Sequence, residues 1–375
     1  MDRLGDKVCC NPTVKLKKGE YYPLIDIEKI APGYKTVRNQ EEIVFNGQSC
    51  TKFEDRDVLF ARITPCLENG KIAMADTNGK CGIGSTELFV FRGIEGISNT
   101  DYVYYLLRMN HIRQLAANSM TGASGRQRAD LNFIKKIKWQ FPVIEQQQKI
   151  ASILTVYDNL IENNNKRIKI LEQMAENLYK EWFVRFRFPN YQNTEFENGI
   201  PKGWNVVRLG EYANISTGKC NREDAEEAGI YPLFDRSQEI KKSNSWIKNC
   251  EAIIIPGEGT SFMPRYYVGK FNLHQRCYCI EPKNKSTGKY LFYSLMLNRI
   301  YFLYVATGAT VPSLRQNNFT SMKIIMPKMS LVKRFDEIIS LLFEQINFLE
   351  KANEKLSKQR DMLLPRLMNG KLEAK

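Results

Sequence analysis

Two stretches of the chain place hydrophobic residues at alternating steps of three and four, which is the spacing of a helix with one apolar seam. The first seam runs through Ile150, Leu154, Tyr157, Ile161, Asn164, Ile168, Leu171, Ala175, Leu178 and Trp182. The second runs through Phe335, Ile339, Leu342, Ile346, Leu349, Asn353, Leu356, Arg360, Leu363 and Leu367. The pattern predicts two long helices that can form a coiled coil. Because proline has no amide hydrogen, we expect Pro365 to kink or end the second helix near Leu364.

Each seam contains one asparagine at a position that the spacing assigns to an apolar residue. In a parallel pair each amide would face hydrocarbon, at a cost of about 1–3 kcal/mol per unpaired group. In a fully overlapped antiparallel pair the two meet, because Asn164 lies 14 residues after Ile150 and Asn353 lies 14 residues before Leu367. There each amide can donate to and accept from the other, and such a pair fixes helix register. We therefore predict antiparallel helices; the alternative is two separate helices with exposed asparagines.

A second apolar stripe runs beside each seam, in the N-terminal half of the helix. Its members are Ile153, Val156 and Leu160 in the first helix and Ile338, Leu341 and Phe348 in the second. In an antiparallel pair these halves lie at opposite ends, so the stripes form two equivalent patches related by a pseudo-twofold axis. We predict that the patches bind two copies of a helical partner. The alternative is contact with the chain's own globular parts.

The segments that precede the two helices resemble each other. The sequence "SMTGASGRQRADLNFIKKIKWQFP" (119–142) matches "VATGATVPSLRQNNFTSMKIIMP" (305–327), and "DYVYYLLRM" (101–109) matches "KYLFYSLML" (289–297). Strands are predicted for the β-branched and aromatic runs at 57–63, 86–92, 251–256 and 274–281, and one helix per lobe at 101–117 and 289–305. The expected fold is mixed α/β, with two globular lobes joined by two long antiparallel helices. The expected boundaries are 1–144 for the first lobe, 145–187 for the first long helix, 188–328 for the second lobe and 329–375 for the second long helix.

Composition narrows the function classes. The net charge of +14 suits a polyanionic partner, and nucleic acid is the first candidate. No apolar run reaches the length of a membrane span and the first residues lack a signal-peptide core, so we expect a cytoplasmic protein. The nine cysteines form no C-x-x-C pair and the two histidines lie far from any cysteine pair, so no metal site is expected. A seam of 33 residues would be about 50 Å long, or roughly 1.5 turns of DNA duplex, so two basic lobes could contact two separated sites.

Several stretches resemble a known family. They are "DVLFARITPCLENGKIA" (57–73), "GSTELFVFR" (84–92), "MTGASGRQRADLNFIKKIKWQFPVIEQQQKIASIL" (120–154), "NLYKEWFVRF" (177–186) and "LLPRLMNGKL" (363–372). Over essentially its whole length the chain resembles the specificity (S) subunit of type I restriction–modification systems. The resemblance implies two target recognition domains, each reading one half of an interrupted, bipartite DNA site. It also implies that the helices act as a spacer and dock two modification (M) subunits, which use S-adenosylmethionine to methylate adenine N6. A restriction (R) subunit can join such a complex, and the S subunit itself has no catalytic residues and no cofactor.

Two loops of the first lobe and one of the second are the candidate DNA contacts, because Arg can bind guanine, Gln can bind adenine, and Thr, Ser and Lys bind phosphates. The first lobe supplies Arg62, Thr64, Asn69 and Lys71, then Thr121, Ser124, Arg126, Gln127 and Arg128; the second supplies Thr307, Thr310, Ser313, Arg315 and Gln316. Phosphate candidates in the second lobe are Lys219, Arg222, Arg236, Lys241, Lys242, Arg265 and Lys270. For each of them the alternative is a solvated surface charge or a turn residue.

Two other functions are open to such a chain. A stand-alone adenine methyltransferase would need an Asp- or Asn-Pro-Pro-aromatic tetrapeptide and a Gly-rich cofactor turn. The nearest strings, "FPNY" (188–191) and "PGEG" (256–259), do not fit. A coiled-coil scaffold that binds only protein would not need the basic, Arg- and Gln-rich loops. We therefore expect a non-catalytic, DNA-binding subunit.

Overall fold

The computed structural model describes all residues except 124, 238 and 375; the side chain of Arg222 is also not described. The chain forms two compact units. Unit 1 comprises residues 1–167 and 349–375, and unit 2 comprises residues 168–348. Each of the two long helices therefore contributes one half to each unit.

Unit 1 is built on two β-sheets. In hydrogen-bonded order, the larger sheet contains β2 (Val8–Cys10), β10 (Leu88–Gly93), β7 (Val58–Ala61), β8 (Ile72–Ala75) and β4 (Thr36–Val37). The smaller contains β5 (Glu42–Val44), β3 (Tyr21–Ile25), β9 (Gly82–Gly84) and β6 (Thr51–Phe53), while β1 (Asp2–Arg3) pairs with β11 (Lys138–Trp139). The helices of the globular part are α1 (Leu4–Lys7), α2 (Thr100–Arg108), α3 (Asn110–Asn118) and α4 (Leu131–Lys136).

The central strands of unit 1 are buried on both faces, which explains their unbroken apolar sequence. In β7, Val58 and Phe60 belong to the core that includes the residues of α2. Leu59, between them, faces the opposite way and belongs to a second core with Phe53. This alternation follows from the two-residue period of a strand.

Unit 2 repeats this plan. Its main sheet contains, in order, β15 (Ala213–Thr217), β20 (Cys277–Pro282), β18 (Lys248–Pro256), β19 (Arg265–Leu273), β16 (Tyr231–Phe234) and β17 (Lys241–Ser243). The strand pairs β12 (Phe196–Glu197) with β13 (Ile200–Pro201) and β14 (Asn205–Arg208) with β21 (Lys323–Met326) complete the strands. The α-helices of its globular part are α6 (Leu209–Tyr212), α7 (Gly288–Leu297), α8 (Arg299–Val305) and α9 (Gln316–Thr320). The sequence "YPL" occurs at 22–24 in β3 and at 231–233 in β16, and the two strands occupy equivalent places, since β3 pairs in parallel with β9 and β16 pairs in parallel with β19. The internal repeat predicted from sequence is therefore structural.

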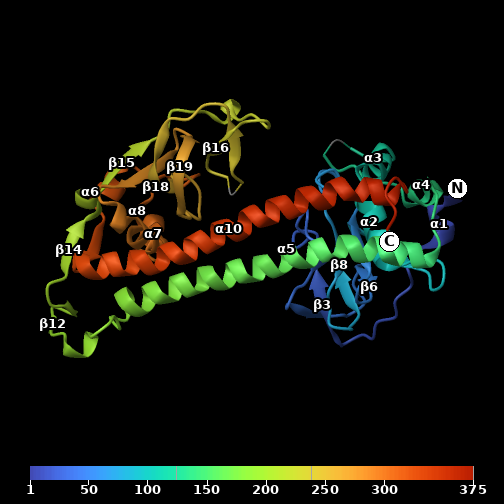
Figure 1. Ribbon diagram of the computed structural model, residues 1–375, viewed down its shortest axis with the longest axis horizontal. Coiled ribbons are helices and arrows are strands. Elements are labelled where there is room, and N and C mark those ends of the chain that lie inside the picture. The colour runs from blue at the N-terminus through green and yellow to red at the C-terminus, as the bar shows by residue number, and fades with distance from the viewer. Residues whose placement is uncertain (124, 238, 375) are drawn as a thin grey trace. The chain divides into compact units, whose positions relative to one another are not determined.

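The long helices α5 (Ile144–Tyr179) and α10 (Met329–Met368) run antiparallel (Figure 1). In unit 1, Asn164 of α5 contacts Asn353 of α10. In unit 2, eighteen residues later in α5 and its π-helical extension (Lys180–Val184), Trp182 contacts Phe335, eighteen residues earlier in α10. One antiparallel register therefore accounts for the contacts within each unit. The predicted seam residues are all buried or half-buried, so the coiled-coil prediction is confirmed.

The structure corrects two sequence-based predictions about helix ends. Of the two outcomes expected at Pro365, a kink or an end of the helix near Leu364, the end is wrong, because α10 continues through Pro365 to Met368. Leu364, Leu367 and Met368 are buried in the core of unit 1, and this packing offsets the loss of one helical hydrogen bond. The helices predicted at 101–117 and 289–305 are each divided in two, at Met109 between α2 and α3 and at Asn298 between α7 and α8.

Candidate nucleic-acid interface

The two candidate loops of unit 1 form one structure. The chain leaving β7 is tied to residues 121–129 by hydrogen bonds from Thr64 N to Gln127 O (3.0 Å) and from Ala129 N to Arg62 O (2.8 Å). Thr121 and Arg128 exchange two further backbone bonds, of 3.1 and 2.9 Å. The fold therefore brings together the two loops that the sequence predicted as DNA contacts. We call these joined loops, residues 62–71 and 121–129, the ridge of unit 1.

The same ridge is present in unit 2. After β18, Leu314 N donates to Gly257 O (2.8 Å), and Thr307 and Ser313 exchange backbone bonds of 2.9 and 2.8 Å. Gly122 and its counterpart Gly308 both have φ of 122°, a conformation that residues with a side chain rarely adopt. The Thr-Gly pairs at 121–122 and 307–308, which align in the two matching sequence segments, therefore form the turn that shapes both ridges.

The side chains on the ridges differ in accessibility. Exposed are Asn69, Thr121 and Arg126 in unit 1 and Thr307, Thr310, Arg315 and Gln316 in unit 2; half-buried are Arg62, Thr64, Lys71, Gln127, Arg128 and Ser313. Ser124 lies outside the described residues. Lys71 and Gln316 have backbone partners inside their own unit, since Lys71 Nζ donates to Ile27 O (2.9 Å) and Gln316 Nε2 donates to Ile215 O (2.9 Å). The other exposed side chains are better placed to meet a ligand.

The phosphate candidates of unit 2 also fall into two groups. Lys219, Arg236, Lys242 and Lys270 are exposed, and Lys270 Nζ lies 4.9 Å from the centre of the Trp246 ring. Lys241 instead pairs with the buried Asp235 at 2.6 Å, and Arg265 donates to the carbonyl of Ser237. Burial raises the pKa of Asp235, but hydrogen bonds from Lys241 and Ser237 outweigh it and lower that pKa to about 2. Lys241 and Arg265 therefore stabilise unit 2 as well as adding charge to its surface.

Sequence reasoning missed the carboxylates of the ridges. Glu87 accepts hydrogen bonds from Arg128, which lower the pKa of its carboxyl group, and Glu258 pairs with Arg236 and Arg276. Glu87 immediately precedes β10, whose first residue, Leu88, is opposite Ala61 of β7. That strand register puts Glu87 beside the candidate loop. A single sequence does not reveal strand register, so Arg62, Arg128 and Arg236 could be nominated from the sequence, but their carboxylate partners and Arg276 could not.

The helix pair carries a polar layer in its seam. Asn164 Nδ2 donates to Asn353 Oδ1 at 2.8 Å, so the two predicted asparagines do meet. The expected reciprocal bond is absent from the interactions of these two described residues, because Asn353 Nδ2 donates instead to Asn165 Oδ1 at 2.9 Å. The two seam asparagines and the neighbouring Asn165, which lies beside the seam, thus form a layer of three amides.

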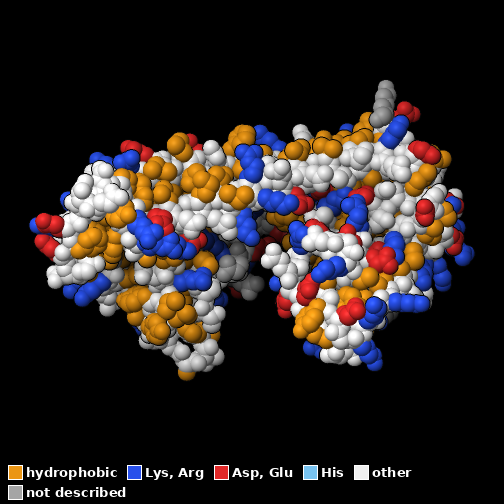
Figure 2. All heavy atoms as spheres, turned by 90° about the horizontal axis from the view of Figure 1, so that it is seen from below, with side chains coloured by type: hydrophobic (Ala, Val, Ile, Leu, Met, Phe, Trp, Pro, Cys, Tyr) orange, Lys and Arg blue, Asp and Glu red, His pale blue; other side chains and the backbone are white. Residues whose placement is uncertain are grey.

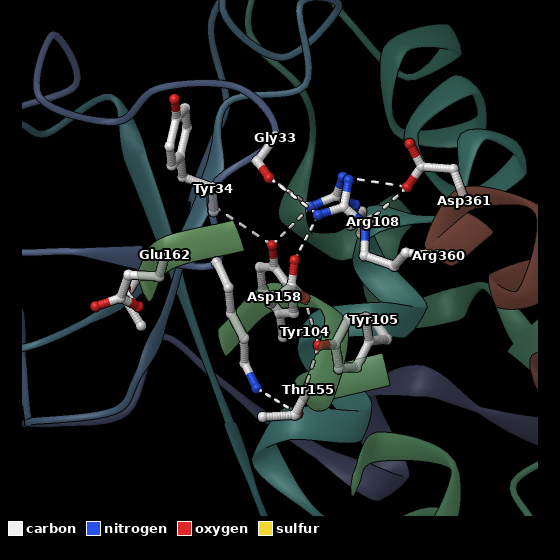
Figure 3. Close-up of polar contacts among 12 residues, drawn as sticks. Gly33, Tyr34, Tyr104, Tyr105, Arg108, Thr155, Asp158, Glu162, Arg360 and Asp361 are labelled. Carbon is white, nitrogen blue, oxygen red and sulfur yellow. Dashed lines mark hydrogen bonds and ion pairs between the residues drawn. The ribbon is translucent and has the colours of Figure 1, made fainter. Parts of the chain in front are cut away.

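A second polar layer joins the helices to the globular part of unit 1 (Figure 3). Arg360 of α10 is buried and hydrogen-bonds Asp158 of α5 and the Gly33 carbonyl. Asp158 also accepts from the hydroxyl group of Tyr105, on α2. Burial lowers the pKa of Arg360, but its bonds to Asp361 and Asp158 outweigh it and raise that pKa above the ordinary value. Arg360 occupies a seam position because it has a charged partner there.

The two apolar stripes remain largely uncovered. The exposed fractions are 56% for Val156, 47% for Leu160, 37% for Ile338, 62% for Leu341 and 72% for Phe348, whereas Ile153 packs against the core of unit 1. On the face drawn in Figure 2, apolar side chains (orange) lie among Lys and Arg side chains (blue), and neither kind forms a single continuous band. The stripes are therefore available to a partner.

Within the described residues, no helix is both long enough and apolar enough to cross a membrane.

Comparison with known proteins gives one family. The family model described as the type I restriction modification DNA specificity domain matches residues 9–173 and 201–358, one copy for each half of the repeat. The MjaIX type I restriction enzyme specificity subunit of Methanocaldococcus jannaschii is 29% identical over 301 residues, covering 73% of this chain and 69% of that protein. The MjaVIII specificity subunit of the same organism is 23% identical over 389 residues, covering 95% and 87%. The crystal structure of a type I restriction–modification S subunit from M. genitalium has a TM-score of 0.56 at 17% identity over 98% of this chain and 95% of that one, which shows a common fold.

Proposed function

Because the chain belongs to the type I restriction modification DNA specificity family and contains two copies of the family domain, we propose that each unit reads one half of a bipartite DNA site. Its role is that of the DNA sequence-specificity subunit of a type I restriction–modification system. One observation supports the two-part site most directly. Both units carry the same ridge with different side chains, so the two half-sites are expected to differ in sequence.

The ridges are suited to groove recognition. Arg126 and Arg315 are exposed on them, and an arginine can donate two hydrogen bonds to one guanine. The Thr residues beside them, and the surface lysines of unit 2, supply the phosphate contacts that position a protein on the duplex. The net charge of +14 adds a salt-dependent attraction to DNA.

The helix pair is proposed as the spacer between the two half-sites and as the docking surface for methyltransferase (M) subunits. One stripe includes Val156 and Leu160 and the other includes Leu341 and Phe348, so two M subunits can bind in equivalent ways. S-adenosylmethionine and the methyl-transfer chemistry then belong to the M subunits, and this chain contributes no catalytic residue. R subunits can join the same complex. Because its ligand is the host's and the invader's DNA, the complex acts in the cytoplasm.

The test is to express this chain with and without the M subunits of its host and to sequence methylated adenines in DNA of random sequence. Methylation of a two-part, interrupted motif is expected only when both proteins are present. Methylation by the isolated chain would contradict the non-catalytic role. A continuous motif would contradict the assignment of one half-site to each unit.

A further inference from the structure

Unit 1 holds one carboxylate between two arginines on its ridge. Glu87 accepts hydrogen bonds from Arg128 Nε at 3.0 and 2.9 Å, one to each carboxylate oxygen, and from Arg128 Nη2 at 2.6 Å. Arg62 approaches the same carboxylate, with Nε 3.7 Å from Glu87 Oε2, and its guanidinium lies 5.2 Å from the centre of the Phe89 ring. Glu87 is therefore an anchor for two guanidinium groups.

Unit 2 holds the same combination of side chains, built from other positions. Glu258 lies 2.5 Å from Arg236 Nη1 and 3.1 Å from Arg276 Nη1. The backbone shows which positions correspond: Arg62 N donates to Glu87 O in unit 1, and Gly257 N donates to Arg276 O in unit 2. Arg276 thus takes the place of Glu87, so the charge at that position is reversed while the Arg–Glu–Arg trio is retained. Retention of the trio despite this reversal points to a use for the trio itself.

In both trios the arginines reach further into solvent than the carboxylate does. The exposed fractions of the side chains are 22% for Glu87 against 42% for Arg128, and 13% for Glu258 against 48% for Arg236 and 61% for Arg276. A guanidinium has five N–H donors in a fixed plane. Arg128 uses Nε and Nη2 on Glu87, which leaves Nη1 directed away from the carboxylate. Arg236 and Arg276 each contact Glu258 through Nη1, so in both trios part of the guanidinium is held by the carboxylate and the other donors face away from that contact.

Arg62 adds an independent observation. Its Nε is buried and has no hydrogen-bond partner among the described residues. A buried donor without a partner costs about 1–3 kcal/mol. A small movement of Glu87 toward Arg62 would give this donor a partner, since Glu87 Oε2 lies 3.7 Å from Arg62 Nε. The trio in unit 1 therefore has one hydrogen bond still to be made.

We propose that Glu87 and Glu258 are positioning residues for DNA recognition, and that each holds its arginines so that the outward edge of a guanidinium meets a guanine in the major groove. The proposal rests on the function proposed above and specifies the base read by each trio. A free arginine loses about 2 kcal/mol of side-chain entropy when it is fixed on a base, and the carboxylate removes part of that loss in advance. The carboxylate would repel DNA phosphates, which favours base edges over the backbone as the target of these arginines.

The experiment replaces Glu87→Gln and Glu258→Gln separately in the full chain, assembled with its M subunits, and sequences the methylated adenines. Glutamine keeps the size of the side chain but cannot hold two guanidinium groups by charge. Glu87→Gln is expected to lower the preference for guanine at one position of one half-site by about 5- to 150-fold, the range of one bidentate contact. Glu258→Gln is expected to do the same in the other half-site only. Glu87→Asp, which retains the charge, is expected to restore part of the preference.

Glu54→Gln is the matched control, because Glu54 also pairs with an arginine of unit 1 (Arg92, 2.7 Å) but lies outside the ridge. It is expected to leave the motif unchanged. Partly exposed ion pairs add little to folding stability, so the melting temperatures of all variants should stay close to that of the parent. An unchanged motif in Glu87→Gln, or a change in both half-sites, would overturn the proposal. If the parent complex methylates no two-part motif, the proposed function itself is contradicted. If it methylates a two-part motif that has no guanine in the affected half-site, only the present inference is contradicted.

Discussion

Asn164 of α5 donates a 2.8 Å hydrogen bond to Asn353 of α10, across a seam that is otherwise almost wholly apolar. Asn353 in turn donates a hydrogen bond to Asn165. In a helix pair held mainly by hydrophobic contacts, which are not directional, such a layer discriminates between registers. A one-heptad slip would place an amide against hydrocarbon.

The Asn164→Leu variant should therefore be less stable than the double variant Asn164→Leu/Asn353→Leu. The single change leaves the Asn353 oxygen, inside the seam, without its donor, at a cost of about 1–3 kcal/mol. The double change removes both seam amides and takes the donor only from the oxygen of Asn165, which lies beside the seam. Urea denaturation of the purified chain measures the difference, with Asn163→Leu at an exposed position as the control. Equal losses in the single and double variants would show that the amide pair does not determine stability at this layer.

The buried pair Arg360–Asp158 gives a second stability prediction. The internal repeat aligns Asp158 with Phe343 and Arg360 with Ala175, and in unit 2 the ring of Phe343 lies 6.5 Å from that of Tyr293, the counterpart of Tyr105. Arg360→Ala alone should cost about 3–5 kcal/mol, because Asp158 keeps a buried charge without its partner. Arg360→Ala with Asp158→Phe copies the apolar arrangement of unit 2 and should recover much of that loss.

Thermal denaturation of the parent, the single variant and the double variant measures both effects. Recovery in the double variant would show that the ion pair can be replaced by packing. Failure to recover would show that the hydrogen bonds from Tyr105 and to Gly33 depend on the charges.

Arg126 and Arg315, which are both exposed and belong to different units, should act on different half-sites. Arg126→Ala is expected to relax the methylated motif in one half, and Arg315→Ala in the other half, each by about 1–3 kcal/mol of discrimination. Sequencing of methylated adenines made by each variant complex gives the answer. A uniform loss of methylation, with both halves of the motif intact, would instead identify a phosphate contact.

The apolar stripes predict partner stoichiometry. Leu160→Asp and Leu341→Asp each put a charge in one stripe at a side chain that is already exposed, so the isolated chain should fold normally. Each variant should bind one M subunit at parental strength and the second about tenfold or more weakly. Native mass spectrometry counts the bound subunits, and Asn159→Asp, an exposed change on the same helix, serves as the control. Loss of both subunits from one substitution would contradict two independent docking sites.

Asp235 predicts acid sensitivity in unit 2. Its pKa is lowered from 3.8 to about 2 in the folded protein, so its ion pair contributes stability above pH 4, and this contribution is lost as the pH falls from about 4 to about 2. Asp235→Asn should remove at most about 2 kcal/mol at pH 7 and should flatten the pH dependence in that window. Denaturation curves at several pH values test this. An unaltered slope below pH 4 would mean that Asp235 has the same pKa in the folded and unfolded chain.

Parts of the interface could be predicted because they depend on local sequence. The Thr-Gly turns were recognised as repeats, since glycine is required by their backbone conformation at both Gly122 and Gly308. The partners of the ridge arginines could not be recognised. Glu87 lies 41 residues from Arg128 in the chain, and only the pairing of β10 with β7 brings them together. The same applies to Lys71 and Gln316, whose backbone partners belong to distant segments.

The spacing of apolar residues alone determined that this chain has two long helices, and the position of one asparagine in each seam determined that they run antiparallel. Both features follow from the period of the helix and from the cost of an unpaired amide. Both can therefore be inferred from the residues of the two helices alone. The tertiary structure decided the rest: that α10 continues through Pro365, that Arg360 has a charged partner inside the seam, and that a carboxylate anchors the arginines of each ridge. These depend on which side chains the fold of each unit places within a few ångströms of one another, and the spacing of residues along the chain does not specify contacts between distant segments.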